Sequence, residues 1–258
     1  MSHSLRHPGI LDRARREGRV TVDGLAVQFG VTHQTIRRDL ADLTTSGALQ
    51  RVHGGAILPP GASNIEYQAR RRLNAAAKTA IGRACAAHIP PRTSVFLDIG
   101  TTSEAVARAL MDHAGLMVVT NNLHVADILQ SHPDCEVIVT GGALRRADMG
   151  LVGAQAVASI EGYRFDHVVL GCSALEGTGE MMDFDAQEVQ VGQALLRRAR
   201  QITLIIDHSK LQRSAPLRIA ALDQVDRVIT DRDLPVAMRQ TCDEHGTAIQ
   251  IVTPGAGR

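Results

Sequence analysis

The chain has 258 residues, 21% of them charged and only 2% aromatic, with a formal net charge of +1. This length accommodates two domains, and the nearly balanced charge argues against a protein that binds nucleic acid through bulk charge alone. Four widely separated cysteines, at 85, 135, 172 and 242, indicate neither a zinc site nor a disulfide framework, so we expect buried thiols. No apolar run has membrane-spanning length and no signal peptide begins the chain, which predicts a cytoplasmic protein without a membrane partner.

The N-terminal segment predicts two short helices. Pro8 suits the first turn of a helix that Gly18 ends. Residues 19–22 are expected to be extended, and a second helix covers Asp23–Phe29. Gly30 then begins a turn, which places the next helix at an angle to this one.

The helix expected over Thr32–Leu43 has one apolar and one polar face. Thr32 can cap it by accepting from amides of the first turn. Ile36 and Leu40 recur at helical spacing with Leu43, while Gln34 and Arg38 point away from them. A second helix that is polar outside, after a glycine-containing turn, is typical of a helix-turn-helix.

Residues 49–57 predict two short strands around Gly54-Gly55, which would form a wing beside that helix. A winged helix-turn-helix domain over residues 1–58 would carry eight arginines against five acidic residues. The alternative is an ordinary helix with a solvated basic face, but the cap, turn and wing together favour double-stranded operator DNA as the partner. The residues expected at the DNA are Thr32, His33, Gln34, Thr35, Arg37, Arg38, Arg51 and His53.

Two strings in this segment, VTHQTIRRDL at 31–40 and RVHGGA at 51–56, resemble the DNA-binding module of the DeoR family of bacterial repressors. The resemblance implies a transcriptional regulator. Members of that family usually have Ser at the position of Thr32 and often Glu near His33, so the base preference of this chain can differ from theirs.

A linker is expected over residues 59–77, where Pro59-Pro60-Gly61 is the clearest signal. Within it, Tyr67–Asn74 predicts a connecting helix. Its run of arginines, Arg70 to Arg72, is expected to be solvated, although an additional contact with the DNA backbone is the alternative.

From Lys78 to the end, apolar strands alternate with amphipathic helices, which predicts a mainly parallel sheet covered on both faces. The expected strands are 93–97, 116–120, 137–140, 167–170, 202–206 and 227–230. Amphipathic helices are expected between most of them, for example 103–110, 123–130, 153–160 and 186–199. The fold class is therefore α/β, with a small DNA-binding domain followed by a larger domain over 78–258.

Ligands of such sheets bind beyond the carboxyl ends of the strands, where this chain has small and polar residues. Gly100 would let backbone approach an oxyanion, and Thr101, Thr102 and the amides of the helix they begin would bind phosphate. Lys210 would supply the cation. The residues expected to bind an effector are Asp98, Gly100, Thr101, Thr102, Asn121, Asn122, Gly141, Gly142, Arg145, Ser173, Asp185 and Lys210.

Other assignments of these residues stay open. A Gly-Thr-Thr-Ser turn is also a common helix start, and Arg145 and Arg146 can be solvated. Asp183, Asp185 and Glu188 could be metal ligands, general bases or a polar helix start; metal ranks last, because no histidine stands at ligand spacing. No metal or cofactor is therefore expected.

Six strings carry the DeoR resemblance through the second domain: LDIGTT, VVTNNL, VTGGALR, GLVG, DFDAQEV and DHSK. The resemblance implies a ribose-5-phosphate isomerase-like fold that binds phosphorylated sugars or polyols. DIGTTSEAVARAL, VTNNLHVA and DHSK resemble the glycerol-3-phosphate branch of the family, which implies sn-glycerol 3-phosphate as the effector.

Two functions compete. The first is an oligomeric repressor of a glycerol or sugar operon that releases DNA when a phosphorylated polyol binds. The second is a sugar-phosphate isomerase in which Asp183, Asp185 or Glu188 acts as the base and Lys210 stabilises an enediolate. Because a metabolic isomerase has no use for a DNA-binding domain, the sequence favours the regulator, with no catalytic residue, and a homo-oligomer that places two such domains on one operator.

Overall fold

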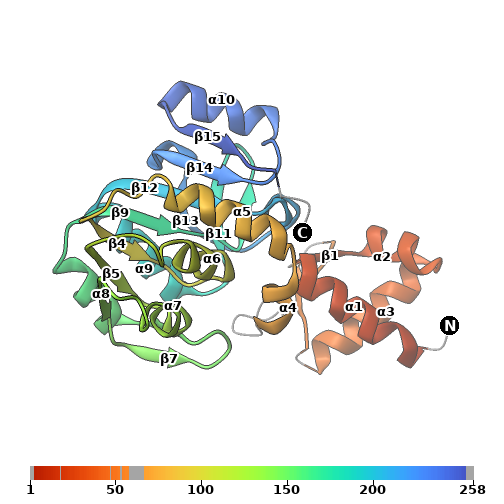
Figure 1. Cartoon of the computed structure of the whole chain (residues 1–258). Coiled ribbons are helices and arrows are strands. Elements are labelled where there is room, and N and C mark those ends of the chain that lie inside the picture. Colours follow the sequence, from red (N-terminus) through yellow and green to blue (C-terminus); the bar gives the residue numbers. More distant parts are fainter. Residues whose placement is uncertain (1–2, 18, 47, 53, 58–66, 254–258) are drawn as a thin grey trace.

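The computed structural model describes residues 3–17, 19–46, 48–52, 54–57 and 67–253, excepting the side chains of 3–5, 12 and 15–17. A small domain of helices and short strands lies beside a larger α/β domain, with helix α4 between them (Figure 1). The linker signal at Pro59-Pro60-Gly61 and the wing residue His53 lie outside the described residues. Among the described helices, none is long and apolar enough to cross a membrane.

The N-terminal domain is a winged helix-turn-helix, as the sequence predicts. Its elements are α1 (His3–Glu17), β1 (Arg19–Thr21), α2 (Val22–Phe29), α3 (His33–Thr45), β2 (Gln50–Val52) and β3 (Gly55–Ile57). Gly30 adopts the left-handed conformation (φ 61°) that ends α2, and the Thr32 hydroxyl caps α3 by accepting from the amide of Thr35 at 3.2 Å. The apolar residues of the three helices then form one core.

The position of Pro8 was predicted wrongly, because α1 begins at His3 and places Pro8 in its interior. A contact between helices accounts for the additional turn. Arg6 donates from Nε and Nη2 to the two carboxylate oxygens of Asp39 on α3, at 2.8 and 3.1 Å. The fully buried Asp39 carboxylate therefore fixes the start of α1 against α3, a contact that helical periodicity does not reveal.

The two glycines of the wing meet different constraints. Gly54 has a positive φ of 75°, with open space where a Cβ would stand. Gly55 begins β3, and a Cβ there would lie 1.9 Å from the carbonyl oxygen of Val20 in β1. The order β1–β3–β2 therefore needs glycine at residue 54 for its backbone conformation and at residue 55 for the close approach of β3 to β1.

The larger domain contains a seven-stranded sheet in the order β15-β14-β12-β9-β4-β5-β6, with every pair parallel. Its strands are β4 (Ser94–Leu97), β5 (Leu116–Thr120), β6 (Cys135–Val139), β9 (Phe165–Leu170), β12 (Ala199–Ile206), β14 (Arg227–Thr230) and β15 (Ala248–Ile251). Six of the seven were predicted; β15 was not. Strand order runs outward in both directions from the adjacent β4 and β9, which makes that pair the topological switch point.

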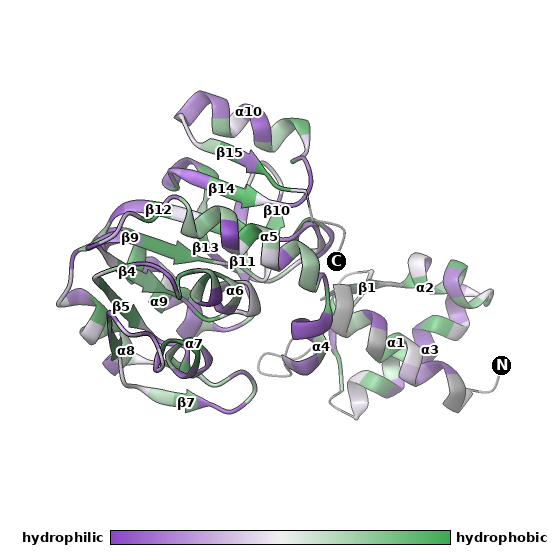
Figure 2. Cartoon of the chain, in the orientation of Figure 1, coloured by the Kyte–Doolittle hydropathy of each residue, from purple (hydrophilic) through white to green (hydrophobic). Residues whose placement is uncertain are grey.

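Helices cover both faces of this sheet (Figure 1). One face packs against α5 (Ala75–Ala86), α6 (Thr101–Ala109) and α7 (Leu123–Leu129), and the other against α8 (Ala154–Glu161), α9 (Ala186–Arg198) and α10 (Val236–His245). Neighbouring residues alternate between the two cores, as Val168 and Val169 do in β9. The central strands are accordingly hydrophobic, whereas α4 (Tyr67–Arg72) is strongly hydrophilic (Figure 2).

Short elements outside the main sheet escaped prediction. They are the hairpin β7 (Ala143–Arg145) and β8 (Gly150–Val152), the antiparallel sheet of β10 (Ala174–Glu176), β11 (Glu180–Asp183) and β13 (Leu217–Ala221), and the 3₁₀ helices η1 (His208–Gln212) and η2 (Leu222–Gln224). The strands β7, β8 and β10 have three residues each, too few side chains for a period to be recognised. Of the four cysteines, Cys85, Cys172 and Cys242 are buried free thiols, whereas Cys135 is only partly buried.

Helices α5 and α6 approach most closely at Gly82. A Cβ at this residue would lie 2.6 Å from both the carbonyl carbon and the oxygen of Ala105 in α6. Helix α5 follows α4 in the chain, and α6 begins directly after the Gly100 turn. The glycine therefore sets the distance between the end of the connecting segment and the turn expected to bind phosphate.

The substitution Gly82→Ala is expected to lower the free energy of unfolding. Overpacking against backbone costs about 1–3 kcal/mol, which exceeds the gain of under about 1 kcal/mol in helix propensity. Urea denaturation measures the change, with Ala76→Ser on the exposed face of α5 as the control. An unchanged unfolding midpoint for Gly82→Ala would contradict the close helix crossing.

Candidate functional site

The polar face of α3 is exposed. His33, Gln34, Arg37 and Arg38 all project from it into solvent, whereas Ile36, Leu40 and Leu43 are buried in the domain core. The first residues of α3 thus present long hydrogen-bonding side chains over one helical turn, next to the capping Thr32. This is the arrangement by which a recognition helix contacts base edges in the major groove.

A hollow separates α3 from the wing. Arg37 of α3 and Arg51 of β2 both line it, together with Asp23 at the start of α2. Asp23 also approaches His33, with its Oδ1 3.4 Å from Nε2. Two exposed arginines on either side of one hollow suit the phosphates of a DNA strand, which fix position and not sequence.

A second candidate site is a cavity at the carboxyl ends of β4, β9 and β12. The segment from Asp98 to Ser103 follows β4, Gly171 to Ser173 follow β9, and Asp207 to Lys210 follow β12. The cavity therefore lies at the switch point of the sheet, where open α/β folds bind ligands. Six of the predicted effector residues line it: Asp98, Gly100, Thr101, Thr102, Ser173 and Lys210.

The turn before α6 has the geometry of an anion site. Gly100 has φ 147° and ψ 149°, a conformation that side chains rarely adopt, and no side chain caps the helix there. Thr101, Thr102 and Ser103, the residues of the first turn, line the cavity. Free amides and the positive end of the helix dipole favour an oxyanion at this point.

Two lysines lie on the cationic side of the cavity. Burial and the charge of Arg213 lower the pKa of Lys210 to about 8, although Asp207 opposes the shift. Burial also lowers the pKa of Lys78 to about 8. Lys78 donates from Nζ to the carbonyl oxygens of Arg70 and Leu73, at 2.5 and 2.7 Å, and so holds the end of α4 against the cavity.

Carboxylates also line the cavity. Burial raises the pKa of Asp98 to about 6, and burial likewise raises the pKa of Asp183. The Asp183 carboxylate accepts from the amides of Phe184 and Asp185 at 2.6 and 3.2 Å. A cavity lined by both cationic and acidic groups suits a ligand that carries both an anionic group and hydroxyl groups.

Three donors in the cavity lack an acceptor among the described residues. They are Nε of Arg70, Nε of Arg213 and Oγ of Ser209, all buried atoms. Sequence reasoning did not select these residues, because Arg70 was expected to be solvated and Arg213 stands three residues beyond the DHSK string. A buried donor without a partner marks a place for an acceptor that the protein does not supply.

The remaining predicted effector residues do not line the cavity. Asn122 caps α7 by accepting from the amide of His124, and Asn121 is fully buried beside Asp98, without a hydrogen bond of good geometry. Gly141 and Gly142 follow β6, at the edge of the sheet. Because β5 and β6 lie one and two strands away from β4, their ends are displaced from the switch point.

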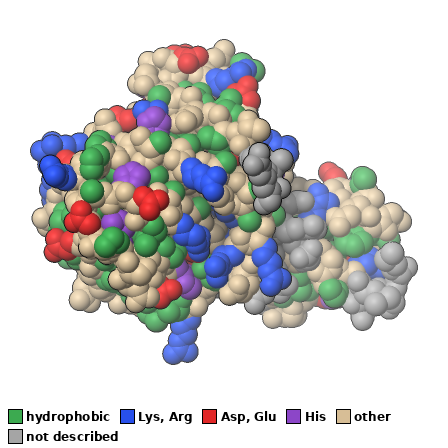
Figure 3. Space-filling view, in the orientation of Figure 1, with side chains coloured by type: hydrophobic (Ala, Val, Ile, Leu, Met, Phe, Trp, Pro, Cys, Tyr) green, Lys and Arg blue, Asp and Glu red, His purple; other side chains and the backbone are tan. Residues whose placement is uncertain are grey.

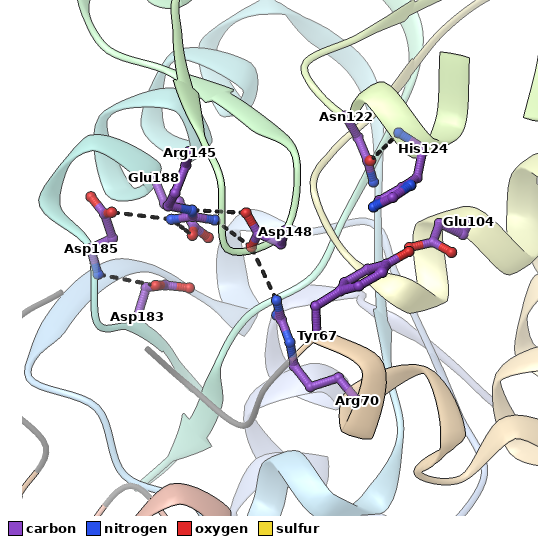
Figure 4. A network of polar contacts seen from close by, with 10 residues as sticks. All are labelled: Tyr67, Arg70, Glu104, Asn122, His124, Arg145, Asp148, Asp183, Asp185 and Glu188. Carbon is purple, nitrogen blue, oxygen red and sulfur yellow. Dashed lines mark hydrogen bonds and ion pairs between the residues drawn. The ribbon is translucent and has the colours of Figure 1, made fainter. Parts of the chain in front are cut away.

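Arg145 and Asp185 belong to an ion-pair network next to the cavity (Figure 4). The Arg145 guanidinium, on β7, contacts Asp148, Asp185 and Glu188, and Asp185 also caps α9. Asp148 in turn accepts from Nη2 of Arg70 at 3.0 Å. The guanidinium of Arg145 is therefore already neutralised by three carboxylates, and the network connects α4, the β7–β8 hairpin and α9.

Family models match both domains. A DeoR-like helix-turn-helix domain matches residues 6–60, and a DeoR C terminal sensor domain matches residues 73–232, more than half of the chain. The chain belongs to the DeoR family. DNA binding follows from the first domain, and a small-molecule effector follows from the sensor domain.

Curated DeoR-family relatives align over nearly their whole length. The glycerol-3-phosphate regulon repressor of Escherichia coli is 37% identical over 97% of this chain and 100% of its own. That of Haemophilus influenzae is 38% identical over 97% and 98%, and the repressor CsqR of E. coli is 36% identical over 96% and 95%. The chain is thus a DeoR-type transcriptional repressor related to these proteins.

Solved structures give a more distant likeness. Ribose 5-phosphate isomerase A from Methanocaldococcus jannaschii aligns with TM-score 0.38 and 12% identity over 52% of this chain and 53% of its own. The beta subunit of eIF2B from Chaetomium thermophilum aligns with TM-score 0.45 and 14% identity over 88% and 85%. Neither likeness bears on what the cavity of this DeoR-family protein binds.

For the recognition helix of this DeoR-family protein, we expect Arg38→Ala to weaken operator binding by about 1–3 kcal/mol and to relax sequence preference, because a bidentate contact with one base is lost. Arg37→Ala should weaken binding to all sequences alike and reduce the salt dependence. Fluorescence anisotropy with operator and scrambled DNA measures both. Arg164→Ala removes the same charge from the sensor surface as a control, and unchanged affinity and preference for Arg38→Ala would refute the assignment.

Phosphate binding in the sensor is expected to weaken as the pH rises above about 8. Lys210 carries its charge below its pKa of about 8 and loses it above, and a dianion prefers the ammonium form. One linked proton changes affinity by up to about tenfold per pH unit. Calorimetry in two buffers of different ionisation enthalpy should detect proton uptake near pH 8. Lys210→Arg, which stays charged, should flatten the profile; a profile as steep as that of the wild type would exclude Lys210 as the titrating group.

Proposed function

We propose that this DeoR-family protein represses an operon of glycerol or sugar metabolism and that a phosphorylated effector, sn-glycerol 3-phosphate, releases it from operator DNA. The proposal depends chiefly on the cavity at the switch point, which the Gly100 turn and Lys210 line together. The same chain carries a recognition helix for DNA, α3. The names of the relatives support the same effector, since two of them are glycerol-3-phosphate regulon repressors.

The chemistry of the cavity agrees with a small phosphorylated polyol. In the proposed complex the amides after Gly100, the Thr101 and Thr102 hydroxyls and Lys210 hold the phosphate. Asp98 and Ser173 accept from or donate to the hydroxyl groups. The isomerase alternative assigns the base to Asp183, Asp185 or Glu188. Asp185 lies outside the cavity lining, and both Asp185 and Glu188 bind Arg145, which leaves Asp183, of these three described residues, as the one candidate without that ion pair. We favour a binding site that performs no turnover.

Oligomerisation through the sensor domain, residues 78–258, completes the proposal. One recognition helix contacts only a few base pairs, so a specific operator needs at least two on an inverted repeat. The helix-turn-helix domain is small and, apart from the exposed Val27, uses most of its described apolar residues in its own core. The larger domain is therefore the proposed site of self-association.

Titration of sn-glycerol 3-phosphate into the protein–operator complex tests the effector. We expect operator affinity to fall as the ligand binds, in proportion to its differential affinity for free and DNA-bound protein. In Lys210→Ala the same response should require a higher ligand concentration. Glucose 6-phosphate, ribose 5-phosphate and inorganic phosphate serve as controls. If another phosphate releases DNA and glycerol 3-phosphate does not, the effector assignment fails; if none binds, the phosphate site fails.

Sedimentation velocity tests the assembly. We expect at least a dimer at micromolar concentration, both free and on a DNA duplex that carries an inverted repeat. The two DNA-binding domains of a dimer would occupy half-sites about one helical turn apart. A monomer under both conditions would rule out the oligomeric repressor.

A further inference from the structure

Helix α4 is the first described element after the DNA-binding domain, yet one of its side chains belongs to the sensor cavity. Arg70 lines that cavity together with the Gly100 turn and Lys210. In the space-filling view, Lys and Arg side chains gather on the sensor face next to the DNA-binding domain (Figure 3). The helix between the domains thus contributes a cation directly to the pocket.

The Arg70 guanidinium has one ionic partner and one unused donor. Its Nη2 lies 3.0 Å from Oδ2 of Asp148, and the side chain is only 13% exposed. Its Nε is buried and has no acceptor among the described residues. A guanidinium can donate two parallel hydrogen bonds to a carboxylate or phosphate. In Arg70, Nη2 donates to Asp148 and the Nε donor remains available for a ligand.

Two neighbours in the cavity show the same deficiency. Arg213 is 7% exposed and its Nε lacks an acceptor, and Oγ of Ser209 is also buried without a partner. Three unsatisfied donors in one cavity would each cost free energy if they stayed unpaired. One phosphate group, with three acceptor oxygens, can satisfy donors from all three residues.

We propose that Arg70 binds the anionic group of the effector and that, through this contact, occupancy of the pocket determines the position of α4. The inference rests on the proposed function, because it requires a phosphorylated ligand in this cavity. Arg70 lies outside the strand ends where effector residues were expected. The inference assigns it two roles: it binds the ligand, and it passes the effect of binding on to α4.

Contacts of α4 give the physical route. Lys78 Nζ donates to the carbonyl oxygens of Arg70 and Leu73, and Lys78 itself lines the cavity. The Tyr67 hydroxyl donates to Oε1 of Glu104 at 2.7 Å, and the Tyr67 ring stacks on His124 with centroids 4.4 Å apart (Figure 4). A dianion that attracts both Arg70 and Lys78 therefore acts on the side chain and the backbone of the same helix.

Asp148 competes with the ligand for Arg70. In the network, Asp148 also accepts from Nε and Nη2 of Arg145, at 2.9 and 2.7 Å. When phosphate binds Arg70, Asp148 keeps Arg145 as its partner, so no buried carboxylate is left unpaired. The two arrangements of Arg70, on Asp148 and on phosphate, supply the two states that an effector needs in order to shift an equilibrium.

Arg70→Ala tests the proposal, with Arg72→Ala, an exposed arginine of the same helix, as the matched control. Calorimetry measures the affinity for sn-glycerol 3-phosphate and inorganic phosphate, and fluorescence anisotropy measures operator affinity without ligand and at saturation. In Arg70→Ala we expect ligand affinity to fall about tenfold or more. At saturating ligand the operator affinity should no longer fall. Arg72→Ala should match the wild type in all measurements.

Lys210→Ala distinguishes ligand binding from the coupling of binding to DNA release. In this variant the ligand-induced loss of operator affinity should return in full once the ligand concentration is raised. Arg70→Lys, which keeps the charge without the fork, is the second variant in case Arg70→Ala fails to fold, and it should also bind less tightly. Wild-type affinity and response in these Arg70 variants would overturn the inference and leave the proposed function standing. Weaker binding with a full response at saturation would overturn the transmission role. If the wild-type protein binds neither probe, the proposed function and the inference fall together.

Discussion

The parallel pairing of β4 with β9 is the constraint on which the sensor site depends. Chain order runs outward from this pair in both directions, so the connections after β4 and β9 leave toward opposite faces of the sheet. A space opens between them at the carboxyl ends, and the end of β12 reaches it from the next strand. The Gly100 turn and Lys210 of η1 therefore meet in one cavity although they are 110 residues apart in sequence, and acidic residues from three segments join them there.

Charge is distributed within this space so that few groups stay uncompensated. Next to the cavity, Arg145 forms ion pairs with Asp148, Asp185 and Glu188, and within the cavity Asp207 lies near Lys210 and Lys78. What remains unpaired among the described side chains of the cavity is mainly donor in character, on Arg70, Ser209 and Arg213. An excess of buried donors agrees with the phosphorylated effector that we propose, because buried groups are poorly screened and act strongly on a bound charge.

Sequence patterns predicted those elements in which apolar residues recur clearly along the chain. The apolar spacing of α3 and six of the seven strands of the main sheet were recognised because their apolar side chains fill the domain cores, and Gly100 was recognised because its turn directly follows a strand. Asp39 and Arg70 were not recognised, since nothing local distinguishes a buried charge from a solvated one; burial of each depends on a partner 33 or 78 residues away. The same reasoning placed Asn121 and Gly141 at the effector, because sequence gives the strand ends but not the order of the strands.

The wing glycines determine how freely the DNA-binding surface can vary. At Gly54 the backbone conformation excludes most residues, but there is space for a side chain, so Asn or Asp, which tolerate a positive φ, would be accommodated. At Gly55 the carbonyl of Val20 occupies the position of any Cβ, and no substitution can be accommodated without separating β3 from β1. A library designed to redirect this repressor to new operators should therefore randomise the exposed residues of α3, Arg51 and Gly54 while it keeps Gly55 and the buried residues of α3 fixed.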